Sequence, residues 1–157
     1  MMQPYMRISA KVDYAVRAAI ELATASDDEL TKAEAIARAQ EIPPKFLENI
    51  LGDLRQGGLV RSQRGAEGGY KLARPAAEIT LADIIRVVEG PMASVRGGRP
   101  EDVEYAGNAE PLRRVWIAVR SSLRAVAEHV TLADLANGKL PAQVEALTSD
   151  PDAWVTH

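Results

Sequence analysis

Three polar residues near the start of one predicted helix could read the bases of a nucleic acid. Lys45, Glu48 and Asn49 fall on the face opposite a stripe of apolar residues. An asparagine amide can pair with adenine through two hydrogen bonds, a carboxylate can accept one from the amino group of cytosine, and a lysine can reach guanine or a phosphate. The same residues are equally typical of a solvated helix face, so this set alone does not identify a DNA-binding surface.

Basic residues also gather around a glycine-rich turn that follows this helix. Three glycines stand within Arg64-Gly65-Ala66-Glu67-Gly68-Gly69 and supply the backbone freedom of a tight hairpin tip. An arginine at such a tip can enter a narrow minor groove, as we expect for Arg64 beside Gly65. The remaining candidates for DNA contacts, chiefly to phosphates, are Arg55, Arg61, Lys71 and Arg74. A plain hairpin turn without a ligand is the alternative explanation of the glycines.

The distribution of charge along the chain is more informative than its total. The formal net charge of −3 argues mildly against indiscriminate binding to nucleic acid. Residues 43–74, however, contain six basic and three acidic side chains, whereas residues 76–157 contain eight basic and twelve acidic ones. A positive segment therefore lies within an acidic protein, although chance placement of solvated charges would give a similar pattern.

Several chemistries are excluded by what the 157 residues lack. There is no cysteine, and therefore no disulfide, thiolate metal site or cysteine nucleophile. The sequence has no Ser/His/Asp arrangement and no metal-ligand spacing, and the glycines at 65–69 do not open a helix as a phosphate-binding loop does. No apolar run reaches membrane-spanning length, and no signal peptide precedes the first helix. We therefore expect a non-enzymatic, cytoplasmic protein without membrane contacts.

Apolar residues at spacings of three and four predict three helices, over 7–25, 32–40 and 43–56. Residues 1–5 should be frayed, 26–28 should form a turn, and Thr31 with Glu34 predicts a capping box for the second helix. The inward positions of the third helix are Phe46, Leu47, Ile50, Leu51 and Leu54. Strands over 59–63 and 70–73 would form a hairpin. Three helices followed by a hairpin, or wing, form a winged helix-turn-helix, whose third helix enters the major groove.

The second half of the chain supplies a long helix and its surroundings. Thr80 caps a predicted helix over 81–89, residues 92–110 form a mobile loop, and the long helix follows over 111–129. Thr131 caps a short helix over 132–137 that Gly138 ends, and a loosely attached tail completes the chain. The long helix has an apolar seam of the coiled-coil kind, formed by Leu112, Trp116, Val119, Leu123, Val126 and Val130. This seam predicts dimerisation, with packing against the helix's own domain as the alternative.

These residues resemble the Rrf2 family of bacterial transcription regulators, which includes the IscR, NsrR, CymR and BadM types. The resemblance spans residues 6 to about 135. It is carried by short segments in the first helix, the third helix, the wing and the regions after it: Met6-Arg7-Ile8-Ser9, Tyr14-Ala15-Val16, Phe46-Leu47-Glu48-Asn49-Ile50-Leu51, Gly58-Leu59-Val60, Arg64-Gly65, Gly68-Gly69-Tyr70, Leu72-Ala73-Arg74, Val88-Glu89-Gly90 and Thr131-Leu132-Ala133-Asp134-Leu135. It implies a homodimer on a partly palindromic operator, with the base-reading stretch at residues 45–49 and Arg64 in the minor groove. Lys45 replaces a residue that is commonly small or polar in the family.

The chain departs from this family pattern in residues 92–110. Many members hold an iron–sulfur cluster through three cysteines in this segment, which here contains none. Ligation of a cluster needs thiolates, alone or together with histidines, and the only histidines are His129 and His157. The resemblance is therefore to a cysteine-free member without a cluster, and we expect no cofactor.

Together these features predict a mainly α-helical fold with a small β-hairpin wing. The expected units are a winged helix-turn-helix DNA-binding domain over 6–90, a flexible sensor-type loop over 91–110, a dimerisation helix with its following turn over 111–138, and a tail over 139–157. The predicted function is a homodimeric repressor that binds double-stranded DNA and responds to a small molecule near Trp116 or Tyr105, or to a partner protein. The alternative, favoured by the acidic net charge and Glu48, is a winged-helix module that binds protein and not DNA.

Overall fold

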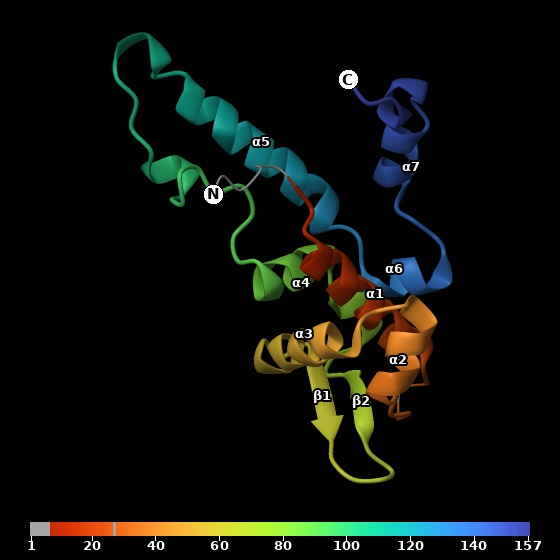
Figure 1. Ribbon diagram of the computed structural model, residues 1–157. Helices are drawn as coiled ribbons and strands as arrows, with labels where there is room; N and C mark the ends of the chain where they lie inside the picture. Colours follow the sequence, from red (N-terminus) through yellow and green to blue (C-terminus); the bar gives the residue numbers. More distant parts are fainter. Residues whose placement is uncertain (1–6, 27) are drawn as a thin grey trace.

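The computed structural model describes residues 7–26 and 28–157, and its elements follow the predicted order (Figure 1). The N-terminal part contains α1 (Ala10–Thr24), α2 (Ala33–Gln40), α3 (Pro44–Gln56), β1 (Val60–Gln63), β2 (Gly69–Leu72), the 3-10 turn η1 (Ala76–Glu78) and α4 (Leu81–Val88). This is the expected helical fold with a two-stranded antiparallel wing. The frayed start at 1–5, Met6 of the resemblance and Asp27 of the expected turn lie outside the described residues.

The C-terminal part is built around α5 (Leu112–Ala127), which extends away from the N-terminal helices as an arm (Figure 1). The segment between α4 and α5 carries the 3-10 turns η2 (Pro100–Asp102) and η3 (Gly107–Ala109), and η2 contacts α5. α6 (Leu132–Asn137) packs on α1, while α7 (Ala142–Thr148) and η4 (Pro151–Trp154) stand apart from α5. Within the described part of the chain, no helix has the length and apolar character needed to cross a membrane.

The core is organised around α1, which contacts α2, α3, α4 and α6. Alanines at positions 15, 18 and 19 form much of the buried face of α1, and their small side chains let the neighbouring helices approach closely. The largest fully buried side chains are Ile36, Leu47, Ile50, Leu51, Leu54, Ile79, Ile84 and Leu132. Four of these belong to α3, and each contributes roughly 1.5–3 kcal/mol through burial. The core therefore holds α3 in one orientation.

Side-chain caps determine where several helices begin. The Ser9 hydroxyl accepts a hydrogen bond from the Val12 amide at 3.1 Å, so α1 begins at Ala10 and not at the predicted residue 7. The caps expected at Thr80 and Thr131 are confirmed, and each belongs to a complete capping box. These caps satisfy amide groups that have no partner within the helix.

The capping box predicted at Thr31 and Glu34 is wrong. The Thr31 amide donates to the Tyr70 carbonyl at 2.8 Å, and the Tyr70 amide donates back to Thr31 at 2.8 Å. Because Thr31 is extended and paired with the wing, α2 begins only after Lys32 and has no side-chain cap. Pairing with the sheet has taken the place of capping at this position.

Three predictions for the C-terminal part also need correction. The loop over 92–110 contains the turns η2 and η3, and the long helix ends at Ala127 and not at His129. The tail contains α7 and η4, which contact each other, and the Trp154 indole donates to the Thr148 carbonyl at 2.6 Å. Every residue of α7 except Val144 is exposed, so this helix has no buried face that a stripe of apolar residues would mark in the sequence.

The turn of the wing requires a glycine at position 68. A Cβ atom placed there would lie 2.1 Å from the Gln63 carbonyl oxygen, so the backbone of the hairpin would have to shift. We expect Gly68→Ala to lower the free energy of unfolding by roughly 1–3 kcal/mol, as measured by urea titration. Gly52 is the matched control: it lies within α3, and a Cβ there would meet nothing within 4 Å. Gly52→Ala should stabilise the protein by about 0.5–1 kcal/mol, so equal effects of the two changes would contradict this account.

Candidate nucleic-acid interface

α3 presents its polar residues on the side that the core leaves free. Lys45, Glu48 and Asn49 are all exposed, and all three lie in the N-terminal half of the helix. A left-handed residue, Glu41 at φ 52°, turns the chain sharply between α2 and α3. The structure therefore places the three predicted base-reading side chains together, at the end of α3 that enters the major groove in helix-turn-helix proteins.

Phe46 is the exception among the residues that were predicted to face the core. Its side chain is 51% exposed, and its ring meets the Tyr14 ring edge-on with 6.0 Å between the centroids. Spacing suggested burial because Phe46 precedes Ile50 by four residues. Phe46 nevertheless lies at the edge of the apolar stripe, where α1 covers only one side of the ring.

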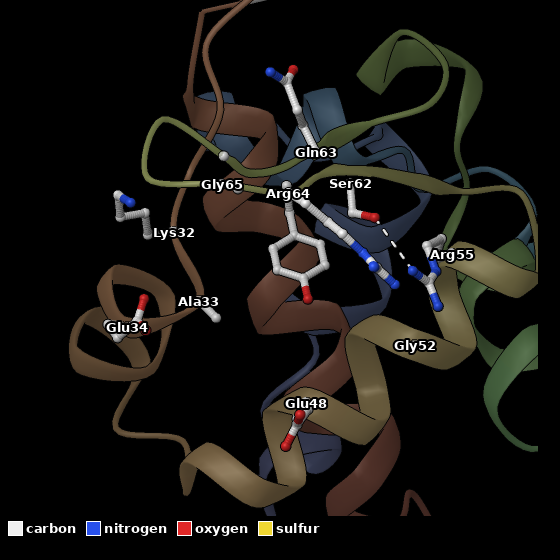
Figure 2. A pocket seen from close by; sticks show the side chains of 13 residues that line it. Lys32, Ala33, Glu34, Glu48, Gly52, Arg55, Ser62, Gln63, Arg64 and Gly65 are labelled. Atoms are coloured by element: carbon white, nitrogen blue, oxygen red, sulfur yellow. Dashed lines mark hydrogen bonds between the residues drawn. The ribbon is translucent and has the colours of Figure 1, made fainter.

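A groove of about 560 Å³ separates α3 from the wing (Figure 2). Its charged lining residues are Lys32, Glu34, Glu48, Arg55 and Arg64. In the view of Figure 2, the Arg64 side chain leans from the hairpin across this groove toward Arg55, whose guanidinium donates to the Ser62 hydroxyl at 3.4 Å. Both predicted arginines therefore border the same hollow.

The wing is attached to the start of α2. In addition to the backbone pair of Thr31 and Tyr70, the Lys32 ammonium donates to the carbonyl of Ala66 at the hairpin tip, at 2.6 Å. A Cβ atom at Gly69 would come within 2.7 Å of the Thr31 carbonyl oxygen, so the two segments are in close contact. Lys32 was missed by the sequence analysis, although a basic residue beside the first turn of the second helix was a usable signal.

Two of the predicted phosphate-binding residues face each other across the hairpin. Arg61 of β1 is directly opposite Lys71 of β2 in the antiparallel register. Like charges in directly opposed positions destabilise a sheet. Neither residue forms an ion pair within the part of the chain that the structure describes. Arg74 differs from both, because its guanidinium lies 3.5 Å from the Asp83 carboxylate.

An ion pair also links α3 to α1. The Lys11 ammonium lies 2.8 Å from the Asp53 carboxylate, and both side chains are partly exposed. A pair of this kind contributes little to stability, about 0–1 kcal/mol. It nevertheless adds a second constraint on the rotation of α3.

The segment between α4 and α5 contacts the long helix through polar groups. The Trp116 indole donates to the Tyr105 hydroxyl at 2.9 Å, and the Arg96 guanidinium lies 5.8 Å from the centre of the Tyr105 ring. Arg120 pairs with Glu101. A backbone hydrogen bond, together with this guanidinium, lowers the pKa of the Glu101 carboxyl, so the pair persists to lower pH than an ordinary glutamate would allow.

The apolar seam of α5 is only partly covered by its own chain. Leu123 is 40% exposed, whereas Leu112, Trp116, Val119 and Val126 are half-buried. Val115, which was not part of the predicted seam, is 50% exposed. Val130 lies beyond the end of α5 and is only 5% exposed, so its own subunit already covers it. The seam that a partner could contact thus ends at Val126.

The donor atoms of this chain do not fit an iron–sulfur cluster. Residues 92–110 contain neither cysteine nor histidine, and thiolates are the obligatory ligands of such clusters. Among residues 7–26 and 28–157, no three histidine, cysteine, aspartate or glutamate side chains come close enough to hold a metal ion. A small hollow of about 230 Å³ is lined by Tyr105, Glu104 and Arg113, but Trp116 does not line it.

A helix-turn-helix followed by a basic wing defines the class of protein: a winged-helix DNA-binding transcription regulator. The model of the Rrf2 family, described as "Iron-dependent Transcriptional regulator", matches residues 8–138. The chain therefore belongs to the Rrf2 family, as the residues 46–51 and 58–74 had indicated, and it is a member without cysteine. The matching region ends at Gly138, so α7 and η4 lie outside it.

Relatives of known name support the same assignment. The chain is 52% identical over 145 residues to Rv1287 of Mycobacterium tuberculosis, described as an HTH-type transcriptional regulator, covering 92% of this chain and 90% of that one. It is 38% identical over 133 residues to the regulator CymR of Bacillus subtilis, covering 84% of this chain and 91% of that one. The solved structure of B. subtilis CymR, "the Global Cysteine Regulator", superimposes with a TM-score of 0.71 at 37% identity over 85% of this chain and 98% of that one. The solved structure of T. potens IscR superimposes with a TM-score of 0.67 at 30% identity, over 98% of this chain and 94% of that one.

Proposed function

We propose that this protein is a homodimeric repressor that binds a partly palindromic operator and blocks access to a promoter. The observation that carries the proposal is the opposed pair Arg61 and Lys71, two cations held together without a carboxylate partner among the described residues. A phosphate between them would relieve their repulsion. Such contacts supply affinity and position the protein without reading sequence.

Sequence would be read by the N-terminal half of α3. With Arg61 and Lys71 on the DNA backbone, the exposed Lys45, Glu48 and Asn49 point toward base edges in the major groove. Arg55 and Arg64 border the groove between α3 and the wing, where they can approach the backbone or the adjacent minor groove. Arg74, already paired with Asp83, has the smallest part in this scheme.

Dimerisation would use the seam of α5. Its partly exposed apolar side chains run along the arm that extends from the winged unit, and a second copy could cover them by the same residues. Two winged units joined in this way would contact two half-sites of one operator. A regulator of this kind acts on the bacterial chromosome, and therefore in the cytoplasm, as a binding protein and not as an enzyme.

The signal would act without a cluster. The hydrogen bond from Trp116 to Tyr105 and the ion pair of Arg120 with Glu101 join the segment 91–110 to α5, so a small molecule or a partner protein that binds there could alter the dimer arm. The hollow beside Tyr105 is the point at which such an effector would compete with these contacts.

A protein-binding module is the second candidate. It is favoured by Glu48 on the exposed face of α3 and by the net charge of −3, because both repel phosphate. The two candidates differ in their response to salt, since only phosphate contacts release condensed counterions.

The test is a fluorescence anisotropy titration of the protein with duplex DNA from its own upstream region. We expect tight binding that resists unlabelled nonspecific competitor and weakens steeply as salt increases. The double variant Arg61→Gln with Lys71→Gln should reduce the slope of log affinity against log salt by about 2. Lys139→Gln, on the segment before α7, removes a distant charge and should leave the slope unchanged. Weak binding that the competitor abolishes would favour the protein-binding module.

A further inference from the structure

The only phenylalanine of the chain is exposed on the surface proposed to face DNA. Phe46 lies in the first turn of α3, between the exposed Lys45 and the buried Leu47, and 51% of its side chain remains accessible. The core beneath is filled by Leu47 and Ile50, each at most 1% exposed. About half of this aromatic side chain therefore remains accessible beside the polar residues of α3.

Neighbouring side chains hold this ring in place. The Tyr14 ring meets Phe46 edge-on, with planes at 62° and centroids 6.0 Å apart. The Arg17 guanidinium lies 4.9 Å from the centre of the Tyr14 ring, and its Nη2 donates to the Gln40 carbonyl at 2.9 Å. α1 and the end of α2 therefore position Phe46 from one side and leave its other side free.

We propose that Phe46 contacts the methyl group of a thymine in each half-site and so determines a preference for thymine at that position. This inference rests on the proposed function as a DNA-binding regulator. The thymine methyl is the apolar feature of the major groove, and an apolar side chain is its natural partner. Phe46 and Asn49 are three residues apart and therefore adjacent on the helix surface. The thymine should thus lie next to the base that Asn49 contacts.

The experiment removes only the methyl group. The tightest duplex selected by the wild-type protein from a random library is resynthesised with deoxyuridine in place of each thymine in turn, and binding is measured by anisotropy. We expect one position in each half-site at which the change weakens binding of the wild type by about three- to tenfold. Phe46→Ala should bind the thymine duplex more weakly by a similar factor and show no further loss with deoxyuridine at that position.

Two further variants separate the methyl contact from general damage. Phe46→Leu keeps an apolar side chain and should retain part of the sensitivity to the methyl group, whereas Tyr14→Phe keeps the edge-on ring pair and should retain all of it. Thermal unfolding of each variant reports whether the fold is intact. Full methyl sensitivity in Phe46→Ala, or tight wild-type binding with no methyl-sensitive thymine, would overturn the inference while leaving DNA binding established. Failure of the wild type to select any sequence would overturn both.

Discussion

Replacement of Val119 and Leu123 together by glutamate is expected to convert the protein from a dimer into a monomer. In the proposed dimer these residues of α5 face their copies across a two-fold axis, so the double change would bury four carboxylates without partners. Burial of an unpaired charge costs several kcal/mol, more than the apolar contacts of so narrow a seam can offset. The change in mass is measured by light scattering or sedimentation.

Loss of the dimer should affect operator binding more than any single contact does. A dimer engages its second half-site at a high effective concentration, and removal of this linkage is expected to weaken binding by about 10²- to 10⁴-fold. The matched control is Ala118→Glu with Ser121→Glu, which adds the same charge to exposed positions of α5 on a face away from the seam. A dimer that survives V119E/L123E would show that the interface lies elsewhere.

Arg64→Ala should weaken operator binding by roughly 1–3 kcal/mol and leave the fold intact. Arg64 is exposed and makes no hydrogen bond or ion pair within the described residues, so its side chain can leave the groove seen in Figure 2 without breaking a contact. An arginine in a narrow minor groove gains from the enhanced negative potential there, and its loss should be largest on operators with A·T-rich flanks.

Arg114→Ala is the control for Arg64→Ala. It removes the same charge from an exposed position on α5, far from the wing, and should leave binding nearly unchanged. Anisotropy titrations at two salt concentrations compare the variants, and circular dichroism confirms folding. If Arg64→Ala binds as tightly as the wild type on every flank, the wing tip is not part of the interface.

The order of helices and strands could be predicted because, along the first 90 residues, the spacing of apolar residues and the positions of proline and glycine indicate the same element boundaries. α3 shows this clearly, since its proline start, its buried stripe and the glycines after it all point to the same helix. The capping box at Thr31 could not be predicted correctly, because the competing partner, Tyr70, is remote in sequence and pairs with Thr31 only after the wing has formed.

Most residues of the candidate site could be proposed from the sequence, although Lys32 was missed, but the pairings of these residues could not. Residue type and helix position suffice to select Lys45, Glu48 and Asn49. The opposition of Arg61 and Lys71, in contrast, depends on the register of the hairpin, and the pairing of Arg74 with Asp83 depends on how α4 packs. Phe46 was assigned to the core because spacing indicates which stripe a residue belongs to, but not how far a neighbouring helix extends over its edge.

The ties between the wing, α2 and α3 have a consequence for how such a protein would respond to a signal. Thr31 with Tyr70 and Lys32 with Ala66 join the wing to the start of α2, and α3 packs on α1, α2 and β1, so the DNA-facing elements form one body. In the proposed dimer, two such rigid winged units would be joined through α5, and only their separation and relative orientation could change. Successive base pairs are about 3.4 Å apart. A small change in the distance between the two recognition helices would therefore put one of them out of register with its half-site. Regulation would then appear as a change in the preferred spacing between half-sites, while each winged unit still reads the same bases.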